Sequence, residues 1–330
     1  MISLQSITYG IYAKALQWFS SYLSDRRQFV TIGSIFSKLV PLQSGVPQGS
    51  VLGPILFTLY TQPLSYTIQK HQFDYHKYAD DTELQKAALP SDFSQISRET
   101  EVCVADVKDW MNKNKLELNE EKTELLVVGD STSLCQVKKE PLTFGPNSVP
   151  FQTSAKYLGV HLDETLSMKE QVTSLCRSSY FHLRKIASIR TCLSDESTAQ
   201  LVSSLILSRL DYCNSTISGF PSCSLNRLQK VQNNASRLVL RKRKLDHVTP
   251  LLVKLHRLPV EARIHYTIAT LAFRHFENSL PLYLSELLHT YQPSQTLRSS
   301  SDKLLKILKT NLRSAGKLSL IHISEPTRQS

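Results

Sequence analysis

The sequence of 330 residues has no long apolar run and no recognisable export signal. A membrane-spanning helix needs about 18 or more consecutive apolar residues, and no stretch of this chain reaches that length. Residues 1–14 also lack the charged segment followed by an apolar one that marks a secretory signal. We therefore expect a soluble protein with no membrane partner, located in the nucleus, the cytoplasm or both.

The chain also lacks paired cysteines. Its six cysteines are scattered, without a Cys-x-x-Cys pair and without histidines at zinc-knuckle spacing, so the pattern gives no support to a structural zinc site. We expect reduced and mostly buried thiols. Cys213 and Cys223 flank a loop, but a reducing compartment argues against a disulfide between them. No internal repeat or long low-complexity run is present.

Acidic residues are few relative to basic ones. The 28 Asp and Glu residues face 39 Lys and Arg residues, which gives a formal net charge of +11. Such a balance favours polyanionic partners, nucleic acid before a membrane surface. With 41% hydrophobic residues, the chain can bury a sizeable core, in one large domain or two ordinary ones.

The first half mixes helical and extended patterns. Apolar residues at helical spacing predict helices over 15–23 and 96–110, and Gly53-Pro54 is typical of a helix start. Alternation and turn residues predict the remaining elements. These are strands over 28–32, 39–42, 73–78, 82–84 and 123–128. The fold class expected is α/β (α+β), with helices on one face of an antiparallel sheet.

The second half is mainly helical after a strand-turn-strand at 156–162. The expected helices are 169–189, 196–211, 225–241 and 259–276. Continued to Lys244, the third helix would place apolar residues on one side, namely Leu225, Leu228, Val231, Ala235 and Leu238. Basic residues would share another side, namely Arg227, Lys230, Arg237, Arg241 and Lys244. This surface predicts phosphate contacts, and a solvated helix end or a nuclear-import signal is the alternative.

Two adjacent carboxylates give the strongest chemical signal. Tyr78-Ala79-Asp80-Asp81 follows Gly45-Val46-Pro47-Gln48-Gly49-Ser50 by about thirty residues. An Asp-Asp pair alone is most often a solvated turn, because Asp bonds the local backbone. Placed at the tip of a strand-turn-strand, the pair can instead hold catalytic metal ions.

The segment PLQSGVPQGSVLGPILFTLYTQPL (41–64), followed by YADDTEL (78–84), resembles the palm of reverse transcriptases of LINE-type non-LTR retrotransposons. ALQWFSSYLSDRRQFVTIG (15–33), DWMNKNKLELNEEKTELLVVG (109–129) and KYLGVHLDETLSM (156–168) resemble further segments of that family. The resemblance covers about residues 9–317 and rests on several motifs in order. It implies a partial palm over 1–168 and a helical thumb over 169–317.

The resemblance implies roles for individual residues. Asp80 and Asp81 would bind Mg²⁺, with Mn²⁺ as the alternative ion, and Tyr78 would pack beneath them. Pro47, Gln48 and Gly49 would position the incoming deoxynucleotide and the template. Lys122 would approach the leaving pyrophosphate as a proton donor, and the hairpin Tyr157-Leu158-Gly159 would grip the primer end. Arg227, Lys230, Arg237, Arg241 and Lys244 would neutralise phosphates of an RNA template and DNA primer.

The third carboxylate that this family uses has no counterpart here. Before Pro47 the only acidic residue is Asp25, which matches a different part of the family pattern. Glu83 stands where the family usually has Gln, and it would repel phosphates or lend a ligand. We expect an RNA-directed DNA polymerase segment that is inactive alone. An inert nucleic-acid-binding relic and a translated pseudogene without a selected function are the alternatives.

The last residues, 318–330, are set apart from this pattern. LSLIHISEPTR (318–328) reads like the translation of a transposase-derived sequencing adapter, so we interpret residues 318–330 as an adapter-derived artefact and set them aside from the fold prediction. The palm interpretation also predicts that the Asp80 turn lies beside Gln48. The hairpin edge next to the missing acid should then be unpaired or covered by Met1–Ile11.

Overall fold

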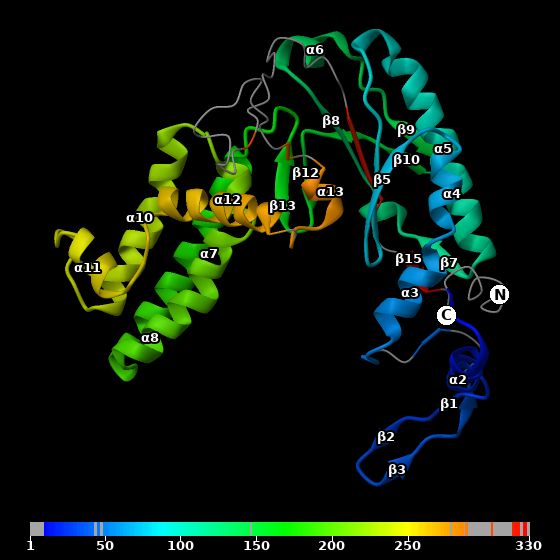
Figure 1. The fold of residues 1–330 in the computed structure, drawn as a ribbon, viewed down its shortest axis with the longest axis horizontal. Helices are drawn as coiled ribbons and strands as arrows, with labels where there is room; N and C mark the ends of the chain where they lie inside the picture. The colour runs from blue at the N-terminus through cyan, green and yellow to red at the C-terminus, as the bar shows by residue number, and fades with distance from the viewer. Residues whose placement is uncertain are drawn as a thin grey trace, which may run out of the picture. The chain divides into compact units, whose positions relative to one another are not determined.

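The computed structural model describes residues 10–42, 45–46, 49–145, 147–277, 279–286, 288–289, 305, 319–323 and 326–328. The chain forms two compact units (Figure 1). Unit 1 comprises Met1–Val127, Cys135–Gln152 and Lys317–Ser330, and unit 2 comprises Val128–Leu134 and Thr153–Gly316. No helix within the described ranges is long and apolar enough to cross a membrane.

Unit 1 begins with a helix and four short strands. The elements are α2 (Ala13–Leu23), β1 (Arg27–Gln28), β2 (Thr31–Ile32), β3 (Ile35–Phe36) and β4 (Val40–Pro41). β1 pairs antiparallel with β4, and β2 with β3, so the segment is a two-stranded ribbon. Gly33 has a φ of +62° at the turn of this ribbon, a conformation that glycine adopts at little cost.

A five-stranded sheet follows, with helices packed against it. The elements are α3 (Gly53–Thr61), α4 (Leu64–Gln69), β5 (Asp74–Tyr78), β6 (Asp81–Gln85), the 3₁₀ turn η1 (Pro90–Asp92), α5 (Phe93–Lys113), β7 (Leu116–Leu118), the 3₁₀ turn η2 (Glu120–Lys122), β8 (Glu124–Val128), α6 (Ser131–Gln136), β9 (Leu142–Phe144), β10 (Asn147–Val149) and β11 (Phe151–Gln152). The strand order is β11-β8-β14-β6-β5. The sheet is mixed rather than purely antiparallel, because β11 pairs parallel with β8.

The core of unit 1 lies between α4, α5 and the sheet. α5 buries Phe93, Thr100, Cys103, Val104, Val107 and Met111, a helical repeat that turns one face toward the sheet. Leu84 of β6 and Leu125 of β8 are fully buried against this face. Tyr60 of α3 donates to the carbonyl of Asn114 at 2.5 Å, which ties α3 to the end of α5. Burial raises the pKa of the Tyr60 hydroxyl.

The centre of the sheet is filled from the far end of the chain. β14 (Ser319–Ile323) lies between β8 and β6, and it pairs antiparallel with β6 (Figure 1). β15 (Pro326–Arg328) pairs antiparallel with β7. Both strands lie in the segment 318–330, which was set aside from the fold prediction. The hairpin edge is covered by this segment, whereas residues 1–9 lie outside the described residues.

Unit 2 consists of a hairpin and a helical bundle. The hairpin strands are β12 (Ser154–Tyr157) and β13 (Val160–Asp163). The helical elements are α7 (Lys169–Ser188), η3 (Arg190–Cys192), α8 (Asp195–Val202), a π-helical turn η4 (Ser203–Leu207), α9 (Ser208–Asp211), η5 (Asn214–Ile217), α10 (Ser222–Val239), α11 (Thr249–Lys254), α12 (Val260–Phe276) and α13 (Leu282–Ser285). The hairpin thus belongs with the helices, and the compact units divide at Thr153 rather than after Met168.

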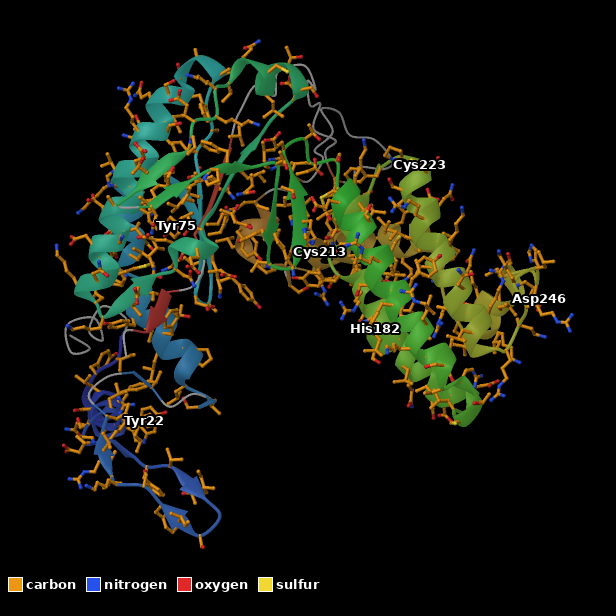
Figure 2. All side chains as sticks on the ribbon, turned by 180° about the vertical axis from the view of Figure 1, so that it is seen from behind. Tyr22, Tyr75, His182, Cys213, Cys223 and Asp246 are labelled. Atoms are coloured by element: carbon orange, nitrogen blue, oxygen red, sulfur yellow. The ribbon has the colours of Figure 1, made fainter. Side chains whose placement is uncertain are left out.

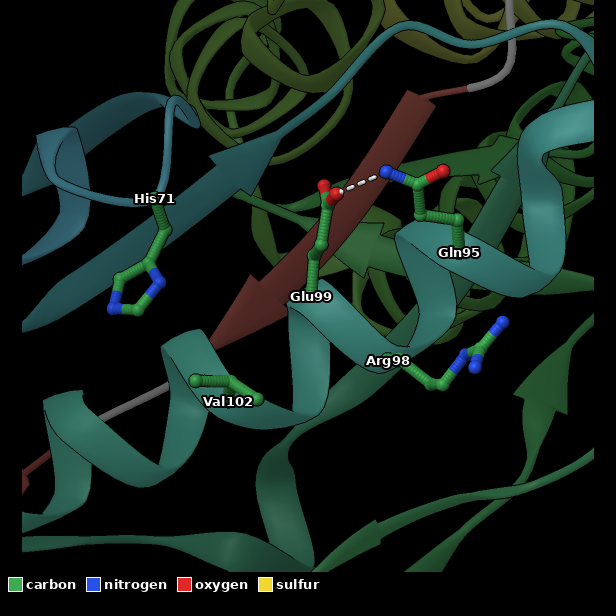
Figure 3. Close-up of a pocket in the computed structure, with 5 residues that line it drawn as sticks. All are labelled: His71, Gln95, Arg98, Glu99 and Val102. Atoms are coloured by element: carbon green, nitrogen blue, oxygen red, sulfur yellow. Dashed lines mark hydrogen bonds between the residues drawn. The ribbon is translucent and has the colours of Figure 1, made fainter.

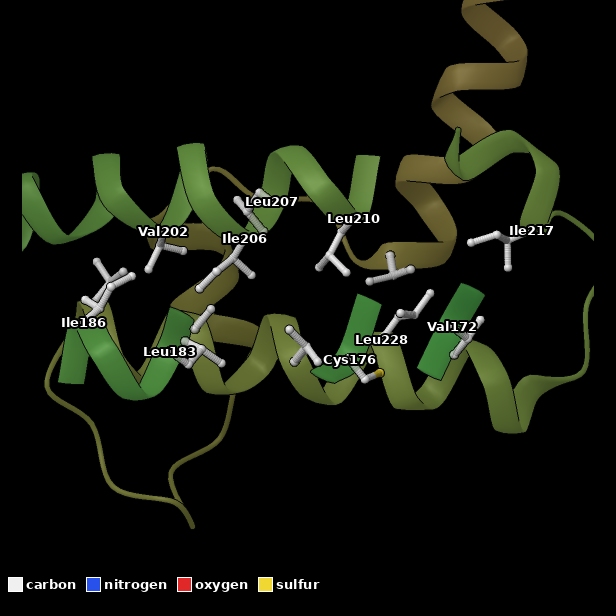
Figure 4. Packing of buried hydrophobic residues seen from close by; sticks show 14 of the residues in the cluster. Val172, Cys176, Leu183, Ile186, Val202, Ile206, Leu207, Leu210, Ile217 and Leu228 are labelled. Atoms are coloured by element: carbon white, nitrogen blue, oxygen red, sulfur yellow. The ribbon is translucent and has the colours of Figure 1, made fainter. Parts of the chain in front are cut away.

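The core of unit 2 is built from facing helix stripes. Val172, Cys176, Leu183 and Ile186 of α7 pack against Leu228 of α10 and its neighbours (Figure 4). Residues of α8, η4 and α9 close the cluster, namely Val202, Ile206, Leu207 and Leu210. The spacing of these residues by three and four positions is what the sequence predicts for amphipathic helices.

Most of the six cysteines are exposed. All six are free thiols, and only Cys103 and Cys176 are buried. Cys213 and Cys223, which Figure 2 labels, form no disulfide. The expectation of mostly buried thiols is wrong because four cysteines lie in turns or on exposed helix positions. Burial raises the pKa of the Cys103 thiol to about 12.

Candidate active site on the β5–β6 hairpin

The two adjacent carboxylates sit at a tight turn, as the sequence predicts. β5 and β6 pair antiparallel from Asp74↔Gln85 to Tyr78↔Asp81, so only Ala79 and Asp80 form the turn. Ala79 has a φ of +54°, the left-handed conformation that such two-residue turns require. Asp80 lies in the turn and Asp81 opens β6, and both are half-buried. The carboxylates therefore mark one end of the sheet.

Strand alternation determines which side chains share a face with Asp81. Directly paired residues of antiparallel strands lie on the same face, and neighbours along a strand alternate. Asp81 therefore shares its face with Glu83 and His76, while Leu84 points into the helix-covered core. Glu83 is 3% exposed and accepts a hydrogen bond from Gln85 Nε2 at 2.7 Å. It lies roughly 7 Å along the strand from Asp81, at two residues of strand rise.

Tyr78 does not pack beneath the carboxylates. Its side chain is 66% exposed, so that expectation is wrong. The cause is the alternation of β5, where Tyr75 and Lys77 are half-buried while Asp74, His76 and Tyr78 are exposed. Tyr78 consequently offers an aromatic face to solvent beside Asp81.

Lys77 fixes the hairpin to α3, a contact that the sequence analysis did not identify. Its Nζ atom donates to the carbonyl of Thr61 at 2.9 Å. Thr61 is the last residue of α3, whose final carbonyls have no partner within the helix and attract cations. Desolvation by burial lowers the pKa of Lys77 to about 8. The alternation of β5 was the available signal, because it turns the residue before Tyr78 inward.

The described residues do not by themselves fit a two-ion centre. Two ions about 4 Å apart need several converging oxygen ligands. Among the residues that the structure describes, no three His, Cys, Asp or Glu side chains form a group that could hold a metal ion. Asp80 and Asp81 thus supply a partial ligand set.

The predicted nucleotide loop is only partly described. Pro47 and Gln48 lie outside the described residues, so the predicted neighbourhood of Gln48 and Asp80 stays a prediction. Gly49 has a φ of +82°, with open space where a Cβ would be. The amide of Gly53 bonds the carbonyl of Ser50 at 3.2 Å, and α3 begins at Gly53 with Pro54 in its first turn, as expected.

Lys122 is placed near the sheet end that carries the carboxylates. It ends η2, directly before β8, and its amide bonds the side chain of Asn119. The connection β6–α5–β8 returns the chain through a helix, so β6 and β8 run in the same direction with one strand between them. Lys122 lies just before β8 and Asp81 is the first residue of β6, and the axes of these two strands are roughly 10 Å apart, which is two strand spacings.

The pocket on the helix side of unit 1 is a separate feature. It is lined by His71, Gln95, Arg98, Glu99 and Val102, next to the exposed side of α5 (Figure 3). Its charges bond to residues nearby: Glu99 accepts from Lys86 at 2.6 Å and from Gln95 at 2.8 Å, and Asp106 bonds His71 at 2.9 Å. The hydrogen bond from Lys86, followed by the one from Gln95, lowers the pKa of Glu99. The network joins α4, α5 and the sheet and is structural.

In unit 2, the predicted primer-grip hairpin has a turn with two positive φ angles. Leu158 has a φ of +45° and Gly159 of +85°, between the paired residues Tyr157 and Val160. Tyr212 donates to the carbonyl of Leu158 at 2.6 Å, and its ring lies 3.7 Å from where a Cβ on Gly159 would be. The turn is therefore held against the segment that follows α9.

The basic helix is shorter than the sequence suggests. α10 ends at Val239, and Arg241 adopts a φ of +52° with the amide of Lys242 bonded to the carbonyl of Arg237 at 2.9 Å. This is a helix-ending Schellman geometry, so Arg241 and Lys244 do not continue the helical face. The apolar side is confirmed, because Leu228, Val231 and Ala235 are buried while Leu225 and Leu238 pack against the same core.

Three of the five basic residues predicted to contact phosphates donate hydrogen bonds to other groups of the protein. Arg237 donates to the carbonyl of Asp246 through Nε at 3.2 Å and Nη2 at 3.0 Å. Arg241 donates to the carbonyl of Leu193 at 3.0 Å. Arg227 donates to Thr173 Oγ1 at 3.1 Å. Lys230, Lys242 and Lys244 are exposed.

Comparisons with known proteins find similarity over the half of the chain that contains the hairpin. Residues 3–162 match the family described as reverse transcriptase (RNA-dependent DNA polymerase). The chain is 28% identical over 195 residues to the probable RNA-directed DNA polymerase from transposon BS of Drosophila melanogaster, covering 55% of this chain and 20% of that protein.

Two further relatives come from mobile elements of the same species. Identity is 25% to the RNA-directed DNA polymerase from mobile element jockey, covering 47% of this chain and 17% of the relative. Identity is 27% to the probable RNA-directed DNA polymerase from transposon X-element, covering 66% of this chain and 24% of the relative. The chain thus spans about a fifth of the length of these relatives.

Proposed function

We propose that this chain, whose residues 3–162 match the reverse transcriptase family, carries part of the active site of an RNA-directed DNA polymerase of a non-LTR retrotransposon. The observation that carries the proposal is the β5–β6 turn, which places Asp80 and Asp81 side by side at one end of the sheet. The substrates are an RNA template, a DNA primer and deoxynucleotides, and the setting is intracellular, nuclear or cytoplasmic.

Each residue of the site has a distinct part in this proposal. Asp80 and Asp81 supply two carboxylates toward a divalent-ion site for Mg²⁺ or Mn²⁺, and such ions stabilise the negative charge that develops during phosphoryl transfer. Lys122, at the same sheet end, holds a proton for the leaving group. Lys77 keeps the hairpin against α3 through the carbonyl of Thr61.

The ligand set predicts weak metal binding by the chain alone. Two carboxylates on one turn hold a single ion, and no described third acid joins them. Line broadening by Mn²⁺ in NMR spectra should therefore centre on residues 78–83 at millimolar ion. Asp80→Asn should abolish the effect. Asp74→Asn is the matched control, because Asp74 is an exposed carboxylate at the far end of the same hairpin.

Primer extension tests the catalytic part. We expect no extension by the chain alone with Mg²⁺ or Mn²⁺, because the carboxylate set is partial. Extension that depends on the ion and disappears in Asp80→Asn but not in Asp74→Asn would contradict this expectation. Broadening that does not localise to the hairpin would remove the basis for the site itself.

A second candidate function is nucleic-acid binding without catalysis. The net charge of +11 and the exposed lysines on α10 and after its end favour it. Binding to duplex should weaken with salt, with log K falling about 0.9 per log unit of salt for each phosphate neutralised. Replacing Lys230, Lys242 and Lys244 by Ala should flatten the slope by up to about 2.7, three times that value.

The control for this experiment is a matched triple variant in unit 1. Lys14, Lys38 and Lys70 are equally exposed, and their replacement should leave the slope unchanged. Arg237 and Arg241 are unsuitable test positions, because their guanidinium groups hold the end of α10. A chain that binds neither duplex nor Mn²⁺ would fit the remaining alternative, a polypeptide without a selected function.

A further inference from the structure

The side chain of Arg26 joins the end of α2 to the start of the predicted nucleotide loop, residues 45–50. Arg26 lies between α2 and β1, shortly after Tyr22, which Figure 2 labels. Its Nε atom donates to the carbonyl of Leu23 at 3.1 Å, and its Nη2 atom donates to the carbonyl of Gly45 at 2.5 Å. Leu23 ends α2, and the last carbonyls of a helix have no partner within it. One guanidinium therefore satisfies the helix end and holds the loop to it.

The backbone of Arg26 contributes to the same junction. Its carbonyl accepts a hydrogen bond from the amide of Leu42 at 2.7 Å, next to the pairing of β1 with β4. Asp25 has a φ of +52°, a left-handed conformation that Asp adopts more readily than most residues, and it makes the turn between α2 and β1. The side chain and the backbone of Arg26 thus both fix the place where the chain leaves the ribbon and enters the loop.

Glycines make this loop costly to order. Gly45 has a φ of +81° and Gly49 of +82°. Glycine loses more conformational freedom on ordering than other residues do, so a loop with glycines needs contacts that hold it in one conformation. Arg26 provides such a contact at Gly45. At the other end, the amide of Gly53 at the start of α3 bonds the carbonyl of Ser50 at 3.2 Å.

The two ends of the loop also carry buried polar atoms without a hydrogen-bond partner among the residues that the structure describes. These atoms are Nη1 of Arg26 and Oγ of Ser50. A buried polar group without a partner costs free energy, and such a group in a folded protein indicates a bound water, an ion or a role in function. Nη1 can donate, and a Ser hydroxyl can donate or accept. Both atoms therefore suit the oxygen atoms of a bound nucleotide.

We infer that Arg26 is a positioning residue, which holds the loop 45–50 in the conformation that receives the incoming deoxynucleotide. The inference rests on the proposed function and adds to it a residue outside both the loop and the β5–β6 hairpin. Arg suits this role because its planar guanidinium presents several N–H donors in a fixed arrangement, so it can bond two carbonyls at once. A residue that only closed the base of the ribbon would have no effect on nucleotide affinity.

Amide exchange in the full chain tests the contact with the loop. Arg26→Met should speed exchange of the Leu42 amide by about tenfold or more, the change expected for the loss of one charge-assisted hydrogen bond. Arg27→Met is the matched control, because Arg27 is an exposed arginine next to Arg26, and it should leave this amide unchanged. Exchange within α5 should be the same in every variant, which shows that the core of unit 1 stays folded.

Titration with dTTP and Mg²⁺, followed through the NMR signals of the Gly49 and Ser50 amides, tests the positioning role. Arg26→Met should raise the Kd for dTTP by about tenfold or more, and Arg27→Met should leave it unchanged. Arg26→Lys keeps the charge but lacks the planar fork, so it should not restore the wild-type affinity.

The two measurements separate the possible failures. Unchanged exchange of the Leu42 amide in Arg26→Met would overturn the inference, and so would an unchanged Kd or an equal loss of affinity in Arg27→Met. Wild-type affinity in Arg26→Lys would also overturn it, because charge alone would then suffice. A wild-type chain whose Gly49 and Ser50 amides do not respond to dTTP would contradict the proposed function, whereas exchange of the Leu42 amide would still decide whether Arg26 holds the loop.

Discussion

Arg190 holds the C-terminal end of α10, and its replacement should loosen this helix. The residue is 8% exposed, and its guanidinium donates to the carbonyls of Leu238 at 2.9 Å and Val239 at 2.7 Å. It also donates to the carbonyl of Leu193 at 2.7 Å and pairs with Asp195, whose pKa it lowers. The last carbonyls of a helix lack partners within the helix, so Arg190 satisfies groups that would otherwise be buried without a donor.

The structure allows the cost to be bounded. Hydrogen bonds from a charged group contribute about 1.5–3 kcal/mol each, but they are not additive within one side chain. The side chain of Asp195 is 58% exposed, so the cost of removing Arg190 lies in the carbonyls that lose their donor, at about 1–3 kcal/mol for each buried group. Arg190→Met keeps much of the apolar stem, so we expect about 3 kcal/mol in all. That value corresponds to roughly 150-fold faster exchange of α10 amides that open with the unit, at 1.4 kcal/mol per tenfold change.

Hydrogen exchange followed by mass spectrometry is the suitable assay. Both tryptophans of the sequence, Trp18 and Trp110, belong to unit 1, so their fluorescence does not report on α10. Arg227→Met is the control, because Arg227 is an exposed arginine on the same helix and its loss should change the free energy by about 0.5 kcal/mol or less. Acceleration of less than about tenfold in Arg190→Met would show that the guanidinium does not hold the helix end.

Three further predictions concern unit 1 and the hairpin of unit 2. The pKa of Lys77 is lowered to about 8 in the folded protein, so the unfolded chain binds more protons above that pH. The free energy of unfolding should therefore rise between about pH 8 and 10. Lys77→Met should remove this rise in urea unfolding followed by Trp110 fluorescence. Leu84→Ala should lower the free energy of unfolding by about 2–5 kcal/mol in the same assay, since the side chain of Leu84 is fully buried between β6 and α5. An unchanged urea midpoint would contradict this packing. Gly159→Ala should cost about 1 kcal/mol in exchange of the β12–β13 amides, because its φ of +85° disfavours a Cβ.

Local patterns predicted the elements of this chain well. α7 at Lys169–Ser188 lies within one residue of the expected helix, because apolar spacing and helix length are properties of the segment itself. The hairpin of β5 and β6 also follows from alternation and a turn. The end of α10 was missed, since Arg241-Lys242-Arg243-Lys244 contains no Gly or Pro, and its stop depends on a left-handed Arg241.

The roles of charged side chains were harder to predict than the elements. The spacing of Arg237 and Arg241 predicted that they bind phosphates, but their guanidinium groups donate to the carbonyls of Asp246 and Leu193. Those acceptors come from other parts of the chain, and a helical wheel contains no information about them. The contact of Lys77 was missed because the carbonyl of Thr61, which accepts the hydrogen bond from Lys77 Nζ, is distant in sequence.

The sheet of unit 1 leaves one strand position that its consecutive elements do not fill. β6 and β8, which α5 connects, are not neighbours in the sheet, and β14 lies in the strand position between them. Its residues Ile321, His322 and Ile323 pair with β6. If that position is essential to the unit, removal of residues 317–330 should speed amide exchange in β6 strongly and lower the stability of unit 1 by several kcal/mol, about 1 kcal/mol for each ladder hydrogen bond lost. Exchange of α7 in unit 2 serves as the internal control. Unchanged protection of residues 81–85 after this truncation would show that the hairpin and its carboxylates are held by α3, α4 and α5 alone.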